Sequence, residues 1–338
     1  MEFGVFLLLQ SPQARPADEV LARGVELAQA AEELGFRNVW LGEHHFSNYS
    51  YLSRPVSVAS YLAARTSTIR LGFAVLPLPL HHPVVVAEEI AMLDVLSGGR
   101  VDAGFGRGYW QYVFDRLGAD RDRERFDEAL DVVLLALRGE TFSYDGAHFQ
   151  IPPTRIVPQP LQRDLPVWIA AQSPESVRDT IRRGLNVLSG GTVPIDVLAR
   201  MRADYDELVA EFRPPAFVVS TQRPVYVADS AADARAAAEH VRWNVRVSVS
   251  QRFDFGGVDT EGRAEPVPLP EEPSLDEMLR DHMVCGTPDE CIAQLRRFDE
   301  ALRPDHFNAS FWFGDLDQAR VLRSLERFAR EVMPAFAD

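Results

Sequence analysis

The chain has 338 residues, 46% of them hydrophobic, and it carries a formal net charge of −15 at pH 7. That length suffices for one barrel domain or for two smaller domains, each with a sizeable core. Because phosphate binding requires a basic face, the excess of 50 Asp and Glu over 35 Lys and Arg argues against a nucleic-acid partner.

The composition also fits a soluble cytoplasmic protein. No apolar run approaches the roughly 20 residues that a membrane span needs, so no membrane partner is expected. The apolar segment 3–9 has no preceding positive charge and no small-residue cleavage site soon after it, which indicates a first strand rather than a signal peptide. Cys285 and Cys291 match no usual zinc or redox spacing and are expected to be ordinary thiols in a reducing compartment.

Short apolar runs alternate with stretches of helical apolar spacing along the whole chain. Strands are expected, in chain order, at residues 3–9, 39–42, 69–76, 101–105, 165–171, 187–189, 217–227 and 306–313. Helices are expected at residues 18–34, 55–65, 83–96, 123–137, 174–183, 195–212, 231–241, 288–302 and 316–333. Roughly eight strand–helix units without an obvious linker predict a single domain, residues 1–338, folded as an α/β (β/α)8 TIM barrel. A doubly wound open sheet is the alternative.

Two segments interrupt this alternation. Residues 142–151 place an Asp-Gly turn between two stretches of apolar–polar alternation, which predicts a hairpin inserted after the fourth helix. Residues 252–274 are rich in Gly, Pro and acidic side chains, and they exceed the ~12–15 residues of an ordinary loop. This second segment is expected to be either a mobile lid or disordered.

Ionisable side chains crowd onto the end of the second expected strand, where Glu43, His44 and His45 follow a buried run. Since side chains alternate along a strand, His44 is expected to face one side while Glu43 and His45 share the other. Active sites of parallel barrels lie at this end of the strands, which favours a general base at His44 over a core histidine. A metal site is the weaker interpretation, because adjacent histidines diverge and no metal-ligand motif is present.

A glycine-rich turn, 106–108, ends the strand expected at 101–105. It is not the dinucleotide fingerprint, because Tyr109 stands where the third glycine of GxGxxG is required. The glycines allow a backbone to approach a flat ligand closely, and Arg107 can hold a phosphate with two hydrogen bonds. The alternative is a tight turn in which Arg107 pairs with a carboxylate such as Glu43.

The run SPES at 173–176 begins the helix after the strand expected at 165–171. Ser173 suits the N-cap position, and the proline suits the first helical position. A helix start offers unpaired amides to an anion, so with Arg107 on the same face a phosphate site is the better interpretation, and a plain cap is the other. His81 and His82 either line the pocket or lie solvated at a helix entry.

Together these segments resemble the bacterial luciferase family of flavin-dependent monooxygenases. The resemblance covers nearly the whole chain, and it is carried by FGVFLL, ELGF, VWLGEHHF, RLGFAVLPLPLHHPV, LSGGRVDAGFGRGY, the SPES helix start and RSLERFAREVMP. It implies a homodimeric (β/α)8 barrel that takes reduced FMN from a separate NAD(P)H-dependent flavin reductase. It further implies that dioxygen, as co-substrate, forms a flavin hydroperoxide that oxygenates a small hydrophobic organic substrate.

The wider superfamily leaves two alternatives open. A deazaflavin-dependent oxidoreductase would transfer a hydride without oxygen, and a non-catalytic flavin-binding relative would carry out neither reaction. The pairing of EHHF with GRG favours FMN. The presence of both His44 and a lid segment favours an enzyme.

By position, the resemblance assigns catalytic roles to His44 and to His82, the latter as a histidine near the pocket. The pair Ala74-Val75 matches a non-proline cis peptide that lies against the flavin ring. Segment 252–274 matches a mobile lid, which would shield the reaction from water. The positions assigned to the flavin and its phosphate are Ala74, Val75, Gly106, Arg107, the Gln172 amide, Ser173 and Ser176.

Three positions depart from the light-emitting members of the family. Gly106 stands where those enzymes carry a reactive cysteine, Trp110 replaces a smaller aromatic residue, and Val75 replaces an alanine. Gly106 and Trp110 reshape the floor and wall of the substrate pocket, which argues against an aldehyde substrate and efficient light emission. The pocket is expected to be apolar and aromatic and to suit a hydrophobic or polycyclic molecule. Its lining is predicted to contain Phe46, Tyr109 and Trp110, with Tyr49 and Phe253 as further candidates.

The chemistry that the resemblance implies needs proton transfer near neutral pH. An imidazole with an ordinary pKa near ~6.5 can supply it, so His44 is expected to act as the acid–base group. His45, expected to point the other way, is predicted to be structural and to pair with Glu43.

Overall fold

The computed structural model describes residues 1–190 and 193–337. In ring order, the barrel strands are β1 (Glu2–Leu7), β2 (Asn38–Leu41), β3 (Arg70–Phe73), β5 (Val101–Gly106), β8 (Val167–Ile169), β9 (Asn186–Leu188), β10 (Val219–Val227) and β12 (His306–Ser310). Every pair of neighbours in this ring is parallel, and β12 pairs with β1 to close it. The predicted (β/α)8 barrel is therefore confirmed, and the open doubly wound sheet is excluded.

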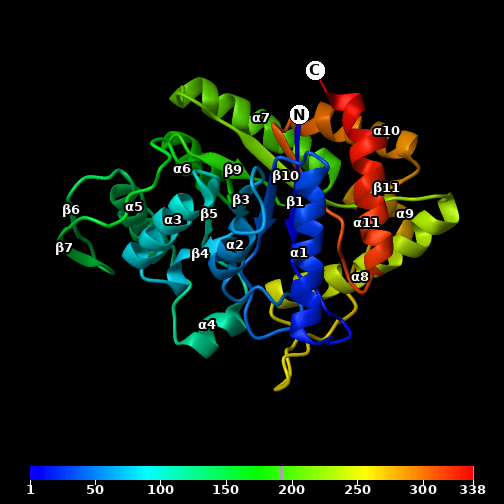
Figure 1. Cartoon of the computed structure of the whole chain (residues 1–338), viewed down its shortest axis with the longest axis horizontal. Helices are drawn as coiled ribbons and strands as arrows, with labels where there is room; N and C mark the ends of the chain where they lie inside the picture. The colour runs from blue at the N-terminus through cyan, green and yellow to red at the C-terminus, as the bar shows by residue number, and fades with distance from the viewer. Residues whose placement is uncertain (191–192, 338) are drawn as a thin grey trace.

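Helices cover the outside of the barrel and connect one parallel strand to the next (Figure 1). They are α1 (Ala17–Glu33), α2 (Pro55–Ala63), α3 (Pro83–Ser97), α5 (Arg123–Leu137), α6 (Pro174–Arg182), α7 (Ile195–Phe212), α8 (Ala231–Arg252), α10 (Pro288–Leu302) and α11 (Gln318–Arg327). After α11 the chain continues through a π turn, Phe328–Val332, and a 3-10 turn, Met333–Phe336. In the described part of the chain, no helix combines the length and the apolar character that crossing a membrane requires.

Side chains of the strands alternate between two apolar layers. On β1, Val5 packs in the layer between strands and helices, whereas Phe6 belongs to the interior cluster. In that interior, Trp40 of β2 meets Trp168 of β8 edge-on, with ring centroids 5.4 Å apart. Gly72, which pairs with Trp40 in the register, leaves room for this ring, since a Cβ there would lie 2.4 Å from Trp40 Cε3. The barrel interior is thus a packed apolar core, and the polar residues at the carboxyl ends of the strands lie above it.

The inserted hairpin is present as predicted, although it is longer than expected. Strand β6 (Phe142–Asp145) pairs antiparallel with β7 (Gln150–Thr154), three residues beyond the predicted end. Several short elements were not predicted: β4 (Leu76–Pro77), the 3-10 turn Leu78–Leu80, α4 (Gln111–Leu117), α9 (Leu275–Glu277), the π turn Met278–His282 and β11 (Val284–Gly286). They are too short for a periodic apolar pattern to identify them.

Helix α8 is the largest correction to the predicted elements. The helical pattern predicts an end near residue 241, whereas α8 continues to Arg252. Its second half shows no apolar stripe, because the face that turns inward there lines a polar cavity. The long loop that follows, residues 253–274, contains a single isolated bridge, Val258 to Ala264, and is the yellow segment that projects below the barrel in Figure 1.

The loop 253–274 is attached to the rest of the protein in its middle and near its end. The Ala264 amide donates to Asn48 Oδ1 at 2.9 Å, and the Asn48 amide donates to the Gly262 carbonyl at 2.7 Å. Near the loop's end, Glu272 accepts hydrogen bonds from Arg242 and Arg246 of α8. These contacts give the loop a defined path over the strand ends, and its motion as a lid remains a prediction.

Candidate functional site

A cavity of about 500 Å³ opens at the carboxyl ends of the barrel strands. This volume lies within the range that holds a small-molecule ligand or cofactor. The segments that follow β2, β3, β5 and β8 all contribute to its wall, which is how residues far apart in the chain come together. Of the positions expected from the sequence, the cavity is lined by His44, Ala74, Val75, Gly106, Arg107, Tyr109, Trp110, Gln172, Ser173 and Ser176.

The structure does not bring Phe46 or His82 into this lining. His82 is exposed at the start of α3, and its ring faces Phe149 of the hairpin with centroids 6.0 Å apart. Phe46 is 42% exposed, and its left-handed backbone, with φ of 61°, turns the side chain toward Arg116 and solvent. We therefore place His82 and Phe46 outside the cavity, because local backbone direction outweighs their position in the motif. Tyr49 lines the cavity, whereas Phe253 does not.

His44 lies against two aromatic rings rather than against a polar partner. Its imidazole centroid is 4.9 Å from that of Tyr49 and 4.5 Å from that of Trp110, and the latter two rings are 4.7 Å apart. Burial lowers the pKa of His44 to about 3, and the nearby His45 acts in the same direction. The sequence-based expectation of an ordinary imidazole is therefore wrong, and His44 is neutral at physiological pH.

Glu43 holds two imidazoles on the opposite side of this turn. Glu43 Oε1 lies 2.7 Å from His45 Nε2 and also 2.7 Å from His81 Nε2. Burial alone would raise the pKa of Glu43, but the hydrogen bonds from both histidines outweigh it and lower the pKa. The predicted pairing of His45 with Glu43 is present, and the alternative partner for Glu43, Arg107, makes no contact with it. His45 also lines the cavity, since β2 ends at Leu41 and the strict alternation stops there.

The surface side of this network determines the tautomer of His81. Arg54 Nη1 lies 3.2 Å from His81 Nδ1. A guanidinium only donates, so Nδ1 must accept and the ring proton must sit on Nε2, which donates to Glu43. His81 therefore links an exposed arginine to the cavity wall. The sequence singled out the neighbouring His82 instead, because nothing local distinguishes the two.

Ala74 and Val75 are joined by a cis peptide bond, as the resemblance implied. Val75 packs directly on Gly106, where a Cβ would lie 2.6 Å from Val75 Cγ2. Val75 and Gly106, which both depart from the light-emitting relatives, therefore depend on each other, because the valine occupies the space that a side chain at position 106 would need.

One group of residues in the cavity lining is suited to an anion. Arg107 is exposed to the cavity, and among residues 1–190 and 193–337 no carboxylate pairs with it. Ser173 caps α6, with its Oγ accepting from the Ser176 amide at 3.2 Å, and both serines line the same wall. Arg123, the first residue of α5, also lines the cavity and contacts Glu175 at the start of α6. Sequence reasoning missed Arg123, although its place at the start of a predicted helix was the available signal.

The inner face of α8 supplies the other wall that the sequence did not predict. Asn244, Ser248 and Arg252 are spaced four residues apart and all line the cavity. Arg252 Nη2 donates to Gln172 Oε1 at 3.1 Å, which joins the end of α8 to the start of α6. These polar side chains adjoin the aromatic group of His44, Tyr49 and Trp110, because Asn244 and Ser248 both contact Tyr49.

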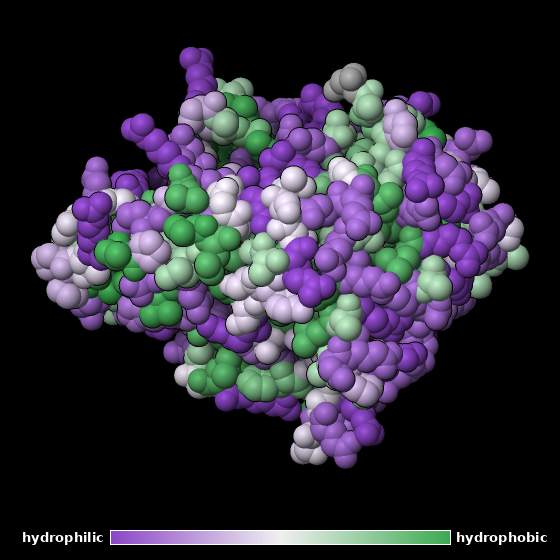
Figure 2. Space-filling model, viewed as in Figure 1, coloured by the Kyte–Doolittle hydropathy of each residue, from purple (hydrophilic) through white to green (hydrophobic). Residues whose placement is uncertain are grey.

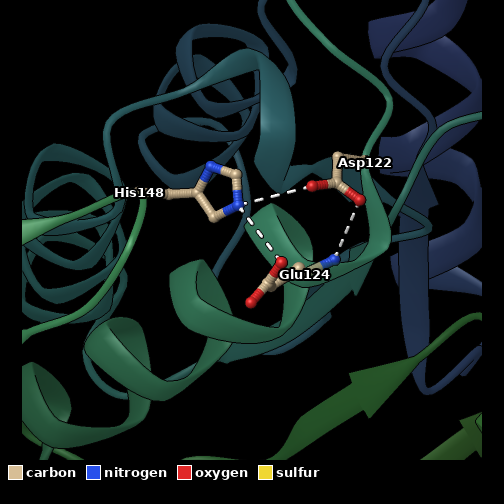
Figure 3. A group of neighbouring side chains, drawn as sticks. All are labelled: Asp122, Glu124 and His148. Atoms are coloured by element: carbon tan, nitrogen blue, oxygen red, sulfur yellow. Dashed lines mark hydrogen bonds and ion pairs between the residues drawn. The ribbon is translucent and has the colours of Figure 1, made fainter.

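A separate group of ionisable side chains lies outside the cavity, where the hairpin meets α5 (Figure 3). His148 Nε2 is 3.3 Å from Asp122 Oδ2 and 4.0 Å from Glu124 Oε2. Asp122 also caps α5 by accepting from the Glu124 amide at 3.2 Å. Helix capping and hairpin attachment account for these contacts.

The fold and this cavity define a (β/α)8-barrel protein with an enzyme-like site at the carboxyl ends of its strands. The family model of luciferase-like monooxygenases matches residues 1–303. The chain belongs to this family.

The similar proteins support the same assignment. The chain is 31% identical to the flavin-dependent trigonelline monooxygenase, oxygenase component, of Acinetobacter baylyi, across 100% of this chain and 96% of that protein. Among solved structures, monooxygenase RslO1 from Streptomyces bottropensis superposes with a TM-score of 0.87 at 24% identity and full coverage of both chains. The oxygenating constituent of 3,6-diketocamphane monooxygenase of Pseudomonas putida, in complex with FMN, gives a TM-score of 0.81 at 18% identity, covering 99% and 98% of the two chains. Both structures share the fold.

Proposed function

We propose that this protein is the oxygenase of a two-component, FMN-dependent monooxygenase, which uses reduced FMN and dioxygen to oxygenate a hydrophobic organic substrate. The observation that carries the proposal is one cavity that is lined both by Arg107, Ser173 and Ser176 and by His44. A cofactor that combines a phosphate with a flat ring system would suit both groups of residues.

The residues present fit a flavin mononucleotide. Arg107 and Arg123 offer guanidinium donors beside the start of α6, where the helix amides favour an anion. Ala74, Val75 and Gly106 supply a flat stretch of backbone and small side chains on which a planar ring can lie. The Trp110 indole nitrogen, on the same cavity wall, is buried without a hydrogen-bond partner among the described residues, so it is a donor available to a ligand.

When bound, reduced FMN would supply the electrons that activate dioxygen. His44, neutral and at the cavity wall, would hold the reacting oxygen or substrate in place through a hydrogen bond to its imidazole. The aromatic rings of Tyr49 and Trp110 would exclude water from that position. The loop 253–274 would close over the cavity and keep solvent out of it during the reaction.

The proposed partner is a flavin reductase that delivers reduced FMN. Support comes from the Acinetobacter relative, whose name describes an oxygenase component.

The proposed oligomer is a homodimer formed through α3 and its neighbour α2. On the outer face of α3, four large side chains that are exposed are apolar, and Tyr61 of the neighbouring α2 is 54% exposed. Figure 2 shows hydrophobic residues gathered over this region of the molecule. An exposed apolar face of this kind is typical of a protein–protein interface. The exposed residues of α3 are Val85, Met92, Val95 and Leu96.

A pair of anaerobic titrations tests the cofactor and its phosphate site. The chain is expected to bind reduced FMN and to bind reduced riboflavin at least tenfold more weakly, because riboflavin lacks the phosphate. Arg107→Gln should remove most of that preference, whereas Arg200→Gln, a matched change on the exposed surface of α7, should leave it intact. No binding of reduced FMN at millimolar concentration would sink the proposal.

Oxygen consumption separates the remaining alternatives. With NAD(P)H, a flavin reductase and FMN, the protein should increase substrate-dependent oxygen uptake. A deazaflavin-dependent oxidoreductase would instead bind reduced F420 more tightly than reduced FMN and would consume no oxygen. A flavin-binding protein without turnover would bind FMN equally well in the unaltered chain and in His44→Ala, with no oxygenated product from either.

A further inference from the structure

The inner face of α8 is built for hydrogen bonding, although it faces a cavity inside the molecule. Residues four apart lie on one side of a helix, so Asn244, Ser248 and Arg252 form a single polar row along the cavity wall. A substrate that is apolar throughout, such as a long alkyl chain, would offer no acceptor to the guanidinium of Arg252 in this row. Covering those N–H groups without hydrogen-bonding them disfavours such a ligand.

Tyrosine hydroxyls gather around the same row. Ser248 makes polar contacts with the hydroxyls of both Tyr49 and Tyr109, and Asn244 makes one with Tyr49. Tyr109 also lies close enough to Arg252 for the guanidinium charge to oppose the rise that burial causes in the pKa of its phenol. Donors from three side chains, Tyr109, Ser248 and Arg252, thus converge on one part of the cavity.

Arg252 keeps donors available for a ligand. Its guanidinium has five N–H groups, of which one, on Nη2, donates to Gln172 Oε1, and its Cζ atom lies 5.6 Å from the ring centroid of Phe253. In the described part of the chain no carboxylate pairs with Arg252. A guanidinium that faces a cavity with a neutral amide as partner is placed to bind an anion bidentately.

The cavity wall that adjoins this row at Tyr49 is aromatic. The rings of His44, Tyr49 and Trp110 contact each other pairwise, with centroid separations between 4.5 and 4.9 Å. Such a surface favours a planar aromatic ligand over an aliphatic one, because rings pack edge-on or offset against it.

We infer that the substrate is an aromatic molecule with an ionised acidic group. Its rings pack on His44, Tyr49 and Trp110, and its acidic group binds Arg252 with help from Ser248 and Tyr109. This inference rests on the proposed oxygenase function, whose substrate class it specifies.

Binding of two matched probes tests this inference without flavin or oxygen. Isothermal titration calorimetry of the full chain is carried out with 2-naphthoate and with 2-naphthamide, which have the same ring system and differ in charge. The unaltered protein should bind the naphthoate at least tenfold more tightly, as expected for a charge-assisted pair. Arg252→Gln should abolish this preference, Arg252→Lys should keep most of it, and Arg200→Gln should not change it.

The outcomes distinguish the two sources of an anion in this cavity. The inference is supported if Arg252→Gln loses the preference for naphthoate over naphthamide while the affinity ratio of reduced FMN to reduced riboflavin is unchanged. A loss of the FMN preference in Arg252→Gln, with naphthoate binding unchanged, would overturn it and assign Arg252 to the flavin phosphate. Equal binding of the two probes, or no binding of either, would also overturn it, while the flavin titrations would still judge the proposed function separately.

Discussion

Gly106 and Val75 offer the sharpest test of how the cavity floor is packed. Gly106→Ala would place a Cβ 2.6 Å from Val75 Cγ2, and a β-branched side chain has little freedom to move away. Overpacking of this kind costs about 1–3 kcal/mol of stability. Val75→Ala removes two methyl groups from a partly buried side chain, so at ~0.8 kcal/mol per fully buried group its loss stays below about 1.6 kcal/mol.

The double variant should be more stable than the sum of the two changes predicts. The methyl group at position 106 would occupy the space that Val75→Ala vacates, which gives a coupling energy of about 0.5–3 kcal/mol. Urea denaturation of the four proteins measures it through the free energies of unfolding. Gly257→Ala is the control, because the nearest atom to a Cβ there is 3.8 Å away, and its effect should stay within about 0.5 kcal/mol. Additive effects of the two changes would refute the packing argument.

The other predictions concern the histidines, the cysteines and the apolar face of α3. His44→Ala should lower turnover by about 10²–10⁴-fold with little change in the Kd of reduced FMN. His45→Ala should mainly lower the free energy of unfolding, by ~1–3 kcal/mol. Equal losses of turnover and stability in both variants would contradict this division of roles. Burial lowers the pKa of His44 from 6.5 to about 3, so between these pH values the unfolded chain binds more protons than the folded chain. The contribution of neutral His44 to the free energy of unfolding is therefore fully present above about pH 6.5 and falls as the pH drops. Urea denaturation at pH 7 and pH 5 should show a smaller fall in the free energy of unfolding for His44→Ala than for the unaltered protein. Burial raises the pKa of Cys291 to about 12 and also raises that of Cys285, so neither thiol should react with DTNB at pH 8 until the chain is unfolded. Leu96→Glu should shift sedimentation from dimer to monomer, and an unchanged sedimentation coefficient would place the interface elsewhere.

The fold and part of the cavity lining could be predicted from the sequence. The alternation of short apolar runs with helical periodicity predicts the (β/α)8 barrel, because burial on both faces of a parallel strand leaves a continuous apolar run. The EHHF and GRG segments sit at strand ends, so the barrel topology alone brings His44 and Arg107 to one cavity. These features depend on local pattern and on a fold that the pattern specifies.

Other features appear only when the chain is folded. The sequence favoured His82, whereas the structure places His81 against Glu43, because the direction of each side chain depends on how the loop enters α3. The polar face of α8 disrupts the helical pattern that would have revealed it. Burial lowers the pKa of His44, and the rings that pack on it belong to Tyr49 and Trp110, which lie 5 and 66 residues away in the chain. Burial and charge act through distances in space, so the chemistry of the cavity is decided by tertiary contacts that no local pattern records.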